Sequence, residues 1–170
     1  MAAFFHRYAS PLGGIILESG GDALTALRFA GEGTLPEGEE RDLPAFAEAE
    51  RWLDLYFSGR DPGFTPETAL SGTPFQRAVW EALRTIPYGE TVTYAGLAER
   101  LGLPRASARA VGGACGRNPI LLIIPCHRVV GQDGRPAGYA GGPERKRMLL
   151  ETEREYRSKS LCCRMEDLPE

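Results

Sequence analysis

The longest unbroken aliphatic run in this chain is only five residues long, from Ile120 to Ile124. Because a helix that crosses a bilayer needs about 20 apolar residues in succession, this run is far too short to span a membrane. The opening segment, MAAFFHRYAS, has no apolar core of signal-peptide length. We therefore expect neither membrane insertion nor secretion. With 42% hydrophobic and 25% charged residues, the 170-residue chain has the composition of an ordinary globular protein.

The first 70 residues predict a small domain of strands and one helix. Apolar alternation between Gly- and Pro-containing turns predicts three strands, at residues 4–8, 15–18 and 24–29. The acidic segment Gly31–Leu43 is typical of an exposed loop. Apolar residues at helical spacing predict a helix between Pro44 and Gly59. The segment Arg60–Gly72, with two prolines and two glycines, is the best linker candidate.

The second half predicts a series of helices. Thr73, Pro74 and Gln76 form the sequence of a capping box, which marks a helix start. One face of this helix is expected to carry the apolar residues Phe75, Val79, Leu83 and Ile86. Thr93 is expected to cap a second helix that ends at Leu101, and Pro104 to begin a third that runs to about Cys115. Two short helices across a Gly-containing turn are typical of a helix-turn-helix unit.

The third helix has an unusual composition for a helix that reads DNA. Residues 106–115 are Ala-Ser-Ala-Arg-Ala-Val-Gly-Gly-Ala-Cys, so Arg109 is its only long side chain. Helices that read base edges in the major groove normally offer long polar side chains. Small residues instead permit close approach to a backbone or a shallow groove, which favours minor-groove or sequence-independent binding. A buried packing helix rich in Ala and Gly is the alternative interpretation.

Charge is divided unevenly along the chain. Residues 1–70 carry 5 basic and 12 acidic side chains, whereas residues 71–155 carry 12 basic and 8 acidic ones. Eleven of those 12 basic residues are arginines, whose planar guanidinium suits phosphate contacts. The second half is therefore compatible with a polyanionic partner although the whole chain has a net charge of −3. A chance asymmetry in an arginine-rich chain would look the same.

The cysteines do not indicate a metal centre. They stand at positions 115, 126, 162 and 163 without a Cys-x-x-Cys pair, and only two histidines could supplement them. A structural zinc site needs four converging ligands, usually in close pairs. We expect no metal, no cofactor and no disulfide framework, and take the reducing cytosol as the default location.

Cys126 stands out because of its position. We expect residues 120–124 to form a buried strand that stops at Pro125, which places Cys126 at a fixed turn. A nearby imidazole can lower the pKa of a thiol. Because neighbouring strand residues point to opposite faces, His127 would need a turn or a bridging water to act on Cys126. Glu153, on a helix that begins after Gly142, could orient the imidazole. An inert buried cysteine and a solvated glutamate remain the alternatives.

Several motifs together resemble one known family. The segment Ile124–Val130, Ile-Pro-Cys-His-Arg-Val-Val, closely resembles the active-site signature of the O6-alkylguanine-DNA alkyltransferases. The segments Ala108–Ala114, Arg117-Asn-Pro and Gly138–Gly142 are similar to the same family in the same order. The match covers roughly residues 73–155, and the pattern Tyr8-x-Ser-Pro-x-Gly extends a weaker similarity into the first half.

The resemblance implies both a fold and a function. The fold would be α+β, with a small N-terminal ribonuclease-H-like domain of sheet and helix (1–70). This domain would pack on a mostly helical C-terminal domain (71–155) that contains the helix-turn-helix and the cysteine. The protein would flip O6-alkylguanine out of double-stranded DNA and accept the alkyl group once, on its own cysteine. We expect a cytoplasmic monomer with a frayed or loosely docked tail at residues 156–170.

The resemblance also implies roles for individual residues. Cys126 would be the nucleophile, His127 would accept its proton through a water, and Glu153 would orient His127. Tyr94 would donate toward the departing guanine. Arg109 would fill the space left by the flipped base. The expected DNA-facing residues beside it are Ala108, Ala110, Gly112, Gly113 and Cys115. The expected pocket residues are Asn118, Val129, Tyr139 and Ala140.

Two departures from the family are visible. Some members carry a serine after the pocket tyrosine, where this chain has Ala140, so only the backbone N–H could contact the substrate oxygen. Some members have an amino-terminal zinc site, for which this chain lacks the cysteines. Three other functions stay open from the sequence. They are a non-catalytic binder of alkylated DNA, a helix-turn-helix regulator with an inert cysteine, and a cysteine hydrolase.

Overall fold

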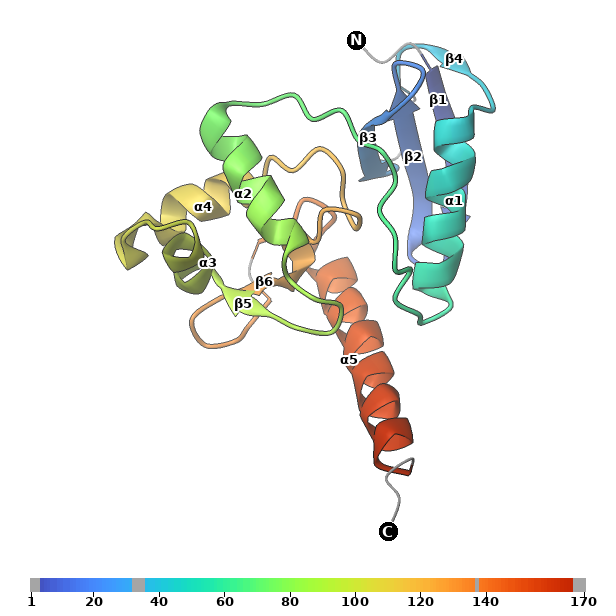
Figure 1. Ribbon diagram of the computed structural model, residues 1–170. Coiled ribbons are helices and arrows are strands. Elements are labelled where there is room, and N and C mark those ends of the chain that lie inside the picture. Colours follow the sequence, from blue (N-terminus) through green and yellow to red (C-terminus); the bar gives the residue numbers. More distant parts are fainter. Residues whose placement is uncertain (1–3, 32–35, 137, 167–170) are drawn as a thin grey trace.

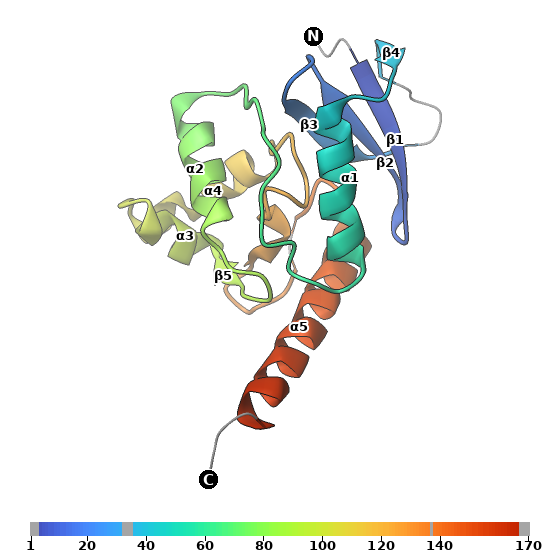
Figure 2. The ribbon, with the colours of Figure 1, turned by 45° about the vertical axis from the view of Figure 1, so that its right-hand side comes forward.

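The computed structural model describes residues 4–31, 36–136 and 138–166. It has the expected α+β architecture, in which a small sheet with one covering helix packs against a mostly helical region (Figure 1). A long C-terminal helix leaves the contact between the two regions and extends away from both (Figure 2). None of the helices in the described part of the chain is both long and apolar enough to cross a membrane.

The N-terminal sheet contains four strands in the order β3-β2-β1-β4. Their bounds are Phe4–Ser10 for β1, Gly13–Ser19 for β2, Leu24–Phe29 for β3 and Glu39–Glu40 for β4. The first three strands are the expected ones, and they pair antiparallel, β1 with β2 and β2 with β3. The expectation of a loop from Gly31 to Leu43 is wrong at β4, which pairs in parallel with the start of β1. Two glutamates at a sheet edge are a poor strand signal, because their pairing depends on the neighbouring strand and not on their own propensity.

Helix α1, Pro44–Phe57, covers one face of this sheet (Figure 2). Its buried side chains recur at helical spacing and include Phe46, Ala49, Leu53 and Tyr56, which are at most 1% exposed. The linker then returns along the sheet edge, where the Leu24 amide donates to Glu67 and the Leu24 carbonyl accepts from Ala69. The linker is therefore fixed by backbone hydrogen bonds although it has little regular structure.

The C-terminal region contains the expected helix-turn-helix. Helix α2, Pro74–Arg84, starts with the complete Thr73–Gln76 capping box. Helix α3, Tyr94–Arg100, starts at the Thr93 cap. The expected third helix is divided into a 3₁₀ turn, Arg105–Ser107, and α4, Ala108–Cys115. Of the apolar residues expected on one face of the α2 helix, Val79, Leu83 and Ile86 are buried, whereas Phe75 in the first turn is 39% exposed.

The predicted strand at residues 120–124 is wrong. Only Ile120 makes a bridge, to Leu27 of β3, and the residues after it form successive turns. Leu122 is the only described residue other than glycine with a positive φ, 69°, and it reverses the chain there. The segment then enters a 3₁₀ turn, Cys126–Arg128, and the short strand β6, Val129–Val130, which pairs in parallel with β5, Val92–Thr93. A short apolar run indicates burial but does not distinguish a strand from a buried turn.

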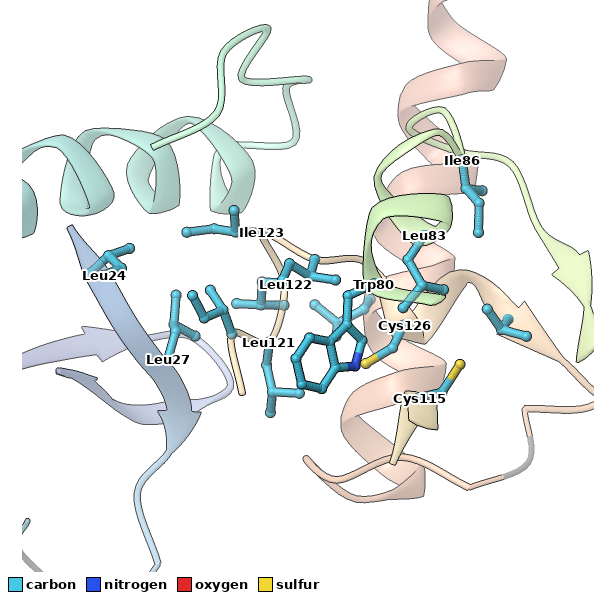
Figure 3. Packing of buried hydrophobic residues seen from close by; sticks show 14 of the residues in the cluster. Leu24, Leu27, Trp80, Leu83, Ile86, Cys115, Leu121, Leu122, Ile123 and Cys126 are labelled. Atoms are coloured by element: carbon cyan, nitrogen blue, oxygen red, sulfur yellow. The ribbon is translucent and has the colours of Figure 1, made fainter. Parts of the chain in front are cut away.

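This buried segment joins the two regions. The Leu27 amide donates to Pro119, and the Leu121 amide donates back to Leu27, so the segment attaches to the free edge of β3. Figure 3 shows Leu121, Leu122 and Ile123 between Leu24 and Leu27 of β3 on one side and Trp80 and Leu83 of α2 on the other. Residues 120–124, which lead to Cys126, are therefore buried in one hydrophobic core that both regions share.

Helix α5, Pro143–Glu166, continues through most of the expected tail. The Tyr156 ring packs edge-on against Tyr88 at 5.0 Å between centroids, and Arg157 lies 3.5 Å from Glu90. The helix shows that residues 156–166 are not frayed. Beyond these contacts of Tyr156 and Arg157 the helix extends away from both regions, which agrees with the expected loose docking. Residues 167–170 lie outside the described residues.

Candidate active site

Cys126 begins the 3₁₀ turn at the end of the buried segment and is 4% exposed. The Asn118 amide Nδ2 donates to the Ile124 carbonyl at 2.7 Å and to Cys126 Sγ at 3.2 Å, and its Oδ1 accepts from the Ile120 amide at 3.0 Å. Asn118 therefore closes the turn and also contacts the thiol. Burial raises the pKa of Cys126 to about 11, against the opposing effects of the Asn118 hydrogen bond and of Lys146.

A cavity of about 200 Å³ opens beside Cys126. It is smaller than the roughly 300–1,000 Å³ typical of pockets for drug-sized ligands, so it suits a single base-sized group. The residues that line it are Tyr94, Gly112, Cys115, Gly116, Cys126, Gly138, Tyr139 and Ala140. Burial raises the pKa of Tyr94 to about 12, so its phenol remains a donor at neutral pH. The Tyr139 hydroxyl is buried and has no hydrogen-bond partner among the described residues.

His127 and Glu153 form a buried pair behind the thiol. His127 Nε2 lies 2.6 Å from Glu153 Oε1, and the two side chains are 0% and 1% exposed. Burial lowers the pKa of His127, against the raising effect of Glu153, so the imidazole is neutral at pH 7. Because an ionised carboxylate only accepts, the neutral ring carries its proton on Nε2. Nδ1, which has no partner among the described residues, then keeps the lone pair that a base requires.

Glu153 is the centre of a larger network. Arg128 donates from Nε to Oε2 at 2.9 Å and from Nη2 to Oε1 at 3.1 Å. The Gly89 amide donates to Oε2 at 2.9 Å, and the Tyr56 hydroxyl donates to Oε1 at 2.8 Å. Burial alone would raise the pKa of Glu153, but the contacts with His127 and Arg128 outweigh burial and hold it at about 2. Because His127 is neutral, Arg128 supplies the permanent positive charge of this network.

Lys146 occupies the other side of the active-site turn. Its ammonium donates to the Val129 carbonyl at 2.6 Å and to the Gly138 carbonyl at 3.1 Å, and it lies 5.7 Å from the centroid of the Tyr94 ring. Burial lowers the pKa of Lys146, against the raising effects of the two cavity cysteines. The side chain therefore joins α5 to both walls of the cavity.

Helix α4 presents most of its expected DNA-facing residues outward. Arg109 and Ala110 are exposed, while Ala108, Gly112 and Gly113 are half-buried. Cys115 differs from this set, because it is 4% exposed and lines the cavity with Cys126. Sequence reasoning placed Cys115 on the DNA-facing surface, but the helical period turns it inward beside the core residue Ala114.

The expected pocket residues also divide into two groups. Tyr139 and Ala140 line the cavity, whereas Asn118 and Val129 lie behind it, and the Val129 carbonyl already accepts from Lys146. Sequence reasoning assigned no role to three donors of the Glu153 network, Tyr56, Gly89 and Arg128, or to Lys146 on the other side of the turn. Two of these residues had a sequence signal. Arg128 lies in the Ile124–Val130 motif, and Lys146 shares the buried face of α5 with Glu153.

No three or more His, Cys, Asp or Glu side chains gather, within the described ranges, where they could hold a metal ion. A helix-turn-helix region built over a buried thiol and a His–Glu pair defines a class of protein that brings a reactive cysteine to DNA. Two family models match. The DNA-binding domain of 6-O-methylguanine DNA methyltransferase matches residues 74–155, and the ribonuclease-like domain of the same family matches residues 4–70. The chain therefore belongs to the 6-O-methylguanine DNA methyltransferase family.

Similar proteins agree with the family models. The methylated-DNA–protein-cysteine methyltransferase of Mycobacterium leprae is 49% identical over 152 residues, which is 85% of this chain and 88% of that protein. That of Methanosarcina acetivorans is 42% identical over 153 residues, which is 88% of this chain and 97% of that protein. The crystal structure of Mycobacterium tuberculosis OGT in complex with DNA aligns with a TM-score of 0.83 at 44% identity, covering 91% of this chain and 94% of that one. The prediction of a DNA-repair methyltransferase is confirmed.

Proposed function

We propose that this protein removes the alkyl group from O6-alkylguanine in double-stranded DNA and keeps it on Cys126, once per molecule. We further propose that it acts as a cytoplasmic monomer without a cofactor. The observation that carries the proposal is the thiol of Cys126 on the wall of a base-sized cavity, backed by the buried His127–Glu153 pair. The thioether formed on Cys126 is a stable bond that water does not cleave, so the proposed reaction ends after one transfer.

Activation of the thiol is the first requirement of this chemistry. A pKa of about 11 leaves only about one thiol in 10⁴ ionised at pH 7, so a base must act as the reaction proceeds. His127 Nδ1 is the base in this proposal and receives the proton through a water. Glu153 holds the opposite nitrogen and stabilises the imidazolium that forms. Cys126 Sγ then bonds to the alkyl carbon as the bond from that carbon to guanine O6 breaks.

Departure of guanine is the second requirement. Tyr94 lines the cavity and remains protonated, which supports its role as the donor that neutralises charge on the leaving guanine. We assign the Cys126 and Val129 carbonyls to the exocyclic amine, the Tyr139 ring to the pocket wall and the Ala140 amide to the substrate oxygen. Asn118 holds the turn that carries the thiol.

DNA binding is assigned to the outer face of α4. Arg109 is exposed at the start of the helix, and the adjoining small residues leave a smooth surface that a backbone can approach. We propose that Arg109 enters the duplex where the guanine leaves, while Ala108, Ala110, Gly112 and Gly113 face the groove. The domain boundaries in this proposal are 1–70 and 71–155, followed by the tail 156–170.

The decisive experiment measures intact protein mass after incubation with a duplex that contains one O6-methylguanine, followed by peptide mapping. The expected result is one added methyl group on Cys126, in no more than one equivalent. Cys126→Ala should abolish the transfer and leave binding to the same duplex largely intact. A folded wild-type protein that binds the duplex without a change in mass would instead be a non-catalytic binder of alkylated DNA.

Base flipping has a separate test. Arg109→Ala should slow transfer from duplex DNA much more than transfer from free O6-alkylguanine, because only the duplex requires the vacated space to be filled. The two transfer rates are compared with those of wild type by the same mass assay. Equal losses on the two substrates would remove the assigned role of Arg109.

A further inference from the structure

We propose that Tyr56, contributed by α1 of the N-terminal region, is a positioning residue for alkyl transfer that acts through Glu153 and His127. The inference rests on the proposed roles of Cys126 and His127. It assigns part of the reaction machinery to a region that contributes none of the residues that line the cavity. No chemistry-bearing motif of the sequence points to Tyr56, which stands in the middle of an ordinary amphipathic helix.

The Tyr56 hydroxyl reaches the centre of the network. Its oxygen lies 2.8 Å from Glu153 Oε1 and 3.3 Å from His127 Nε2, and the whole side chain is 0% exposed. Glu153 and His127 are more than 70 residues away in sequence, so the contact exists only because the two regions are packed together. These are the partners of the hydroxyl in the described structure, so removing it alters the network and no other hydrogen bond.

The hydrogen-bond directions follow from the groups present. An ionised carboxylate has no proton, so the phenol must donate to Glu153 Oε1. The phenol oxygen then offers a lone pair toward His127 Nε2, the same nitrogen that Glu153 contacts at 2.6 Å. Two acceptors on one side of the ring both require the proton on Nε2. Tyr56 therefore supports, beside Glu153, the tautomer in which Nδ1 is available to act as the base, and it tunes the carboxylate that holds the ring.

The ring of Tyr56 is held as firmly as its hydroxyl. It stacks on Trp52 at 5.2 Å between centroids and meets Tyr88 edge-on at 5.6 Å and His127 edge-on at 6.2 Å. Burial, followed by the nearby Glu153 charge, raises the pKa of Tyr56 well above its ordinary value. The phenol therefore stays protonated, and remains a donor, over the whole pH range in which alkyl transfer would be measured.

Tyr88 provides a matched control for Tyr56. Its ring packs against Tyr56 in the same aromatic cluster, and its hydroxyl is also buried, but that hydroxyl has no hydrogen-bond partner among the described residues. Tyr→Phe at either position removes one buried oxygen and keeps the ring. Only the change at position 56 removes a donor to Glu153.

The first test compares wild type, Tyr56→Phe and Tyr88→Phe as full-length proteins. The rate of methyl transfer from a duplex with one O6-methylguanine is measured between about pH 5.5 and 9. Tyr56→Phe should slow transfer about tenfold, a fraction of the 10²–10⁴ that a positioned general base contributes. It should also move the acid limb of the profile to higher pH, because a carboxylate that loses a donor interacts more strongly with the imidazolium. Tyr88→Phe should keep the wild-type rate and profile.

The second test observes the tautomer directly. The chain has only two histidines, so ¹⁵N-labelled imidazole spectra contain His127 and, as an internal control, His6 on the sheet. Wild type should show the Nε2–H tautomer at His127. Tyr56→Phe should keep this tautomer through Glu153 but take up a second proton, on Nδ1, at a higher pH than wild type, while His6 is unchanged. A wild-type Nδ1–H tautomer would overturn the inference without any variant, even if Tyr56→Phe did not fold.

The two proposals fail in different ways. If wild type transfers methyl to Cys126 and Tyr56→Phe matches Tyr88→Phe in rate, pH profile and spectrum, Tyr56 is merely a packing residue. If wild type transfers nothing to Cys126, the proposed function fails first.

Discussion

The two sides of the Cys126 turn are built in opposite ways. On the Glu153 side, one carboxylate receives hydrogen bonds from Tyr56, Gly89, Arg128 and His127, and both of its oxygens are satisfied. On the cavity side, the Tyr139 hydroxyl is buried without a partner among the described residues. The side that positions the base is complete in the resting protein. The side that meets the substrate keeps a polar atom available for it.

The Glu153 side needs to be rigid because it holds the base, whereas the cavity side needs free space because it receives the substrate. A base acts efficiently only if its tautomer and orientation are already fixed, which the Glu153 network provides before DNA binds. A cavity that admits a base needs free space, and the lining here consists of two tyrosines, two cysteines and small residues. Substitutions should therefore affect folding stability strongly on the first side and weakly on the second.

The largest expected effect comes from Glu153→Gln. This change leaves the Arg128 guanidinium, 9% exposed, without its opposite charge. The expected loss in the free energy of unfolding is about 3–5 kcal/mol, as for other broken buried ion pairs, and transfer should slow as well. Urea unfolding measures the first effect and the mass assay the second.

The control for this substitution lies on the same helix. Glu151 pairs with Arg147, but the two side chains are 54% and 52% exposed. Glu151→Gln should change the free energy of unfolding by no more than about 0.5 kcal/mol, because solvent screens such pairs. Similar losses for the two variants would show that the Glu153 network stabilises the fold no more than an exposed ion pair does.

A pH titration tests the same network without a large structural change. The pKa of Glu153 is about 2 in the folded protein against an ordinary 4.5, so its contribution is fully present above about pH 5 and is lost as pH falls toward 2. The gap in unfolding free energy between wild type and Glu153→Gln should therefore close as the pH falls. A gap that is the same at pH 7 and pH 3 would show that the carboxylate charge does not stabilise the fold.

The smallest effect is expected on the cavity side. Tyr139→Phe removes a buried hydroxyl that has no partner among the described residues. The free energy of unfolding should change by less than about 0.5 kcal/mol, or rise slightly, because no hydrogen bond is lost and a desolvated polar atom is removed. Urea unfolding checks this directly. A loss above about 1 kcal/mol would mean that the hydroxyl is already bonded in the resting protein, and the contrast between the two sides would disappear.

Local chemistry explains which elements the sequence predicted correctly. Thr73 and Gln76 satisfy each other's backbone amides, and Thr93 caps the next helix, so these starts depend only on residues three apart. The predictions fail where contacts between residues distant in the sequence determine the local structure. Residues 120–124 form turns instead of a strand because the edge of β3 and the Asn118 side chain satisfy their backbone groups. The edge strand β4 exists because β1 is available to pair with it.

Local spacing predicted the helix-turn-helix, and the motif around Cys126 predicted the nucleophile and His127. The resemblance to the family implied the α+β class and the role of Glu153. Those features depend on local spacing or on contiguous motifs. Only the tertiary structure brought Tyr56, Gly89 and Arg128 onto one carboxylate, and only it turned Cys115 from the DNA-facing surface into the cavity. A buried charge needs hydrogen-bond donors, and the packing of the core decides which donors lie beside it. Here the donors come from α1, the loop after α2 and the active-site turn.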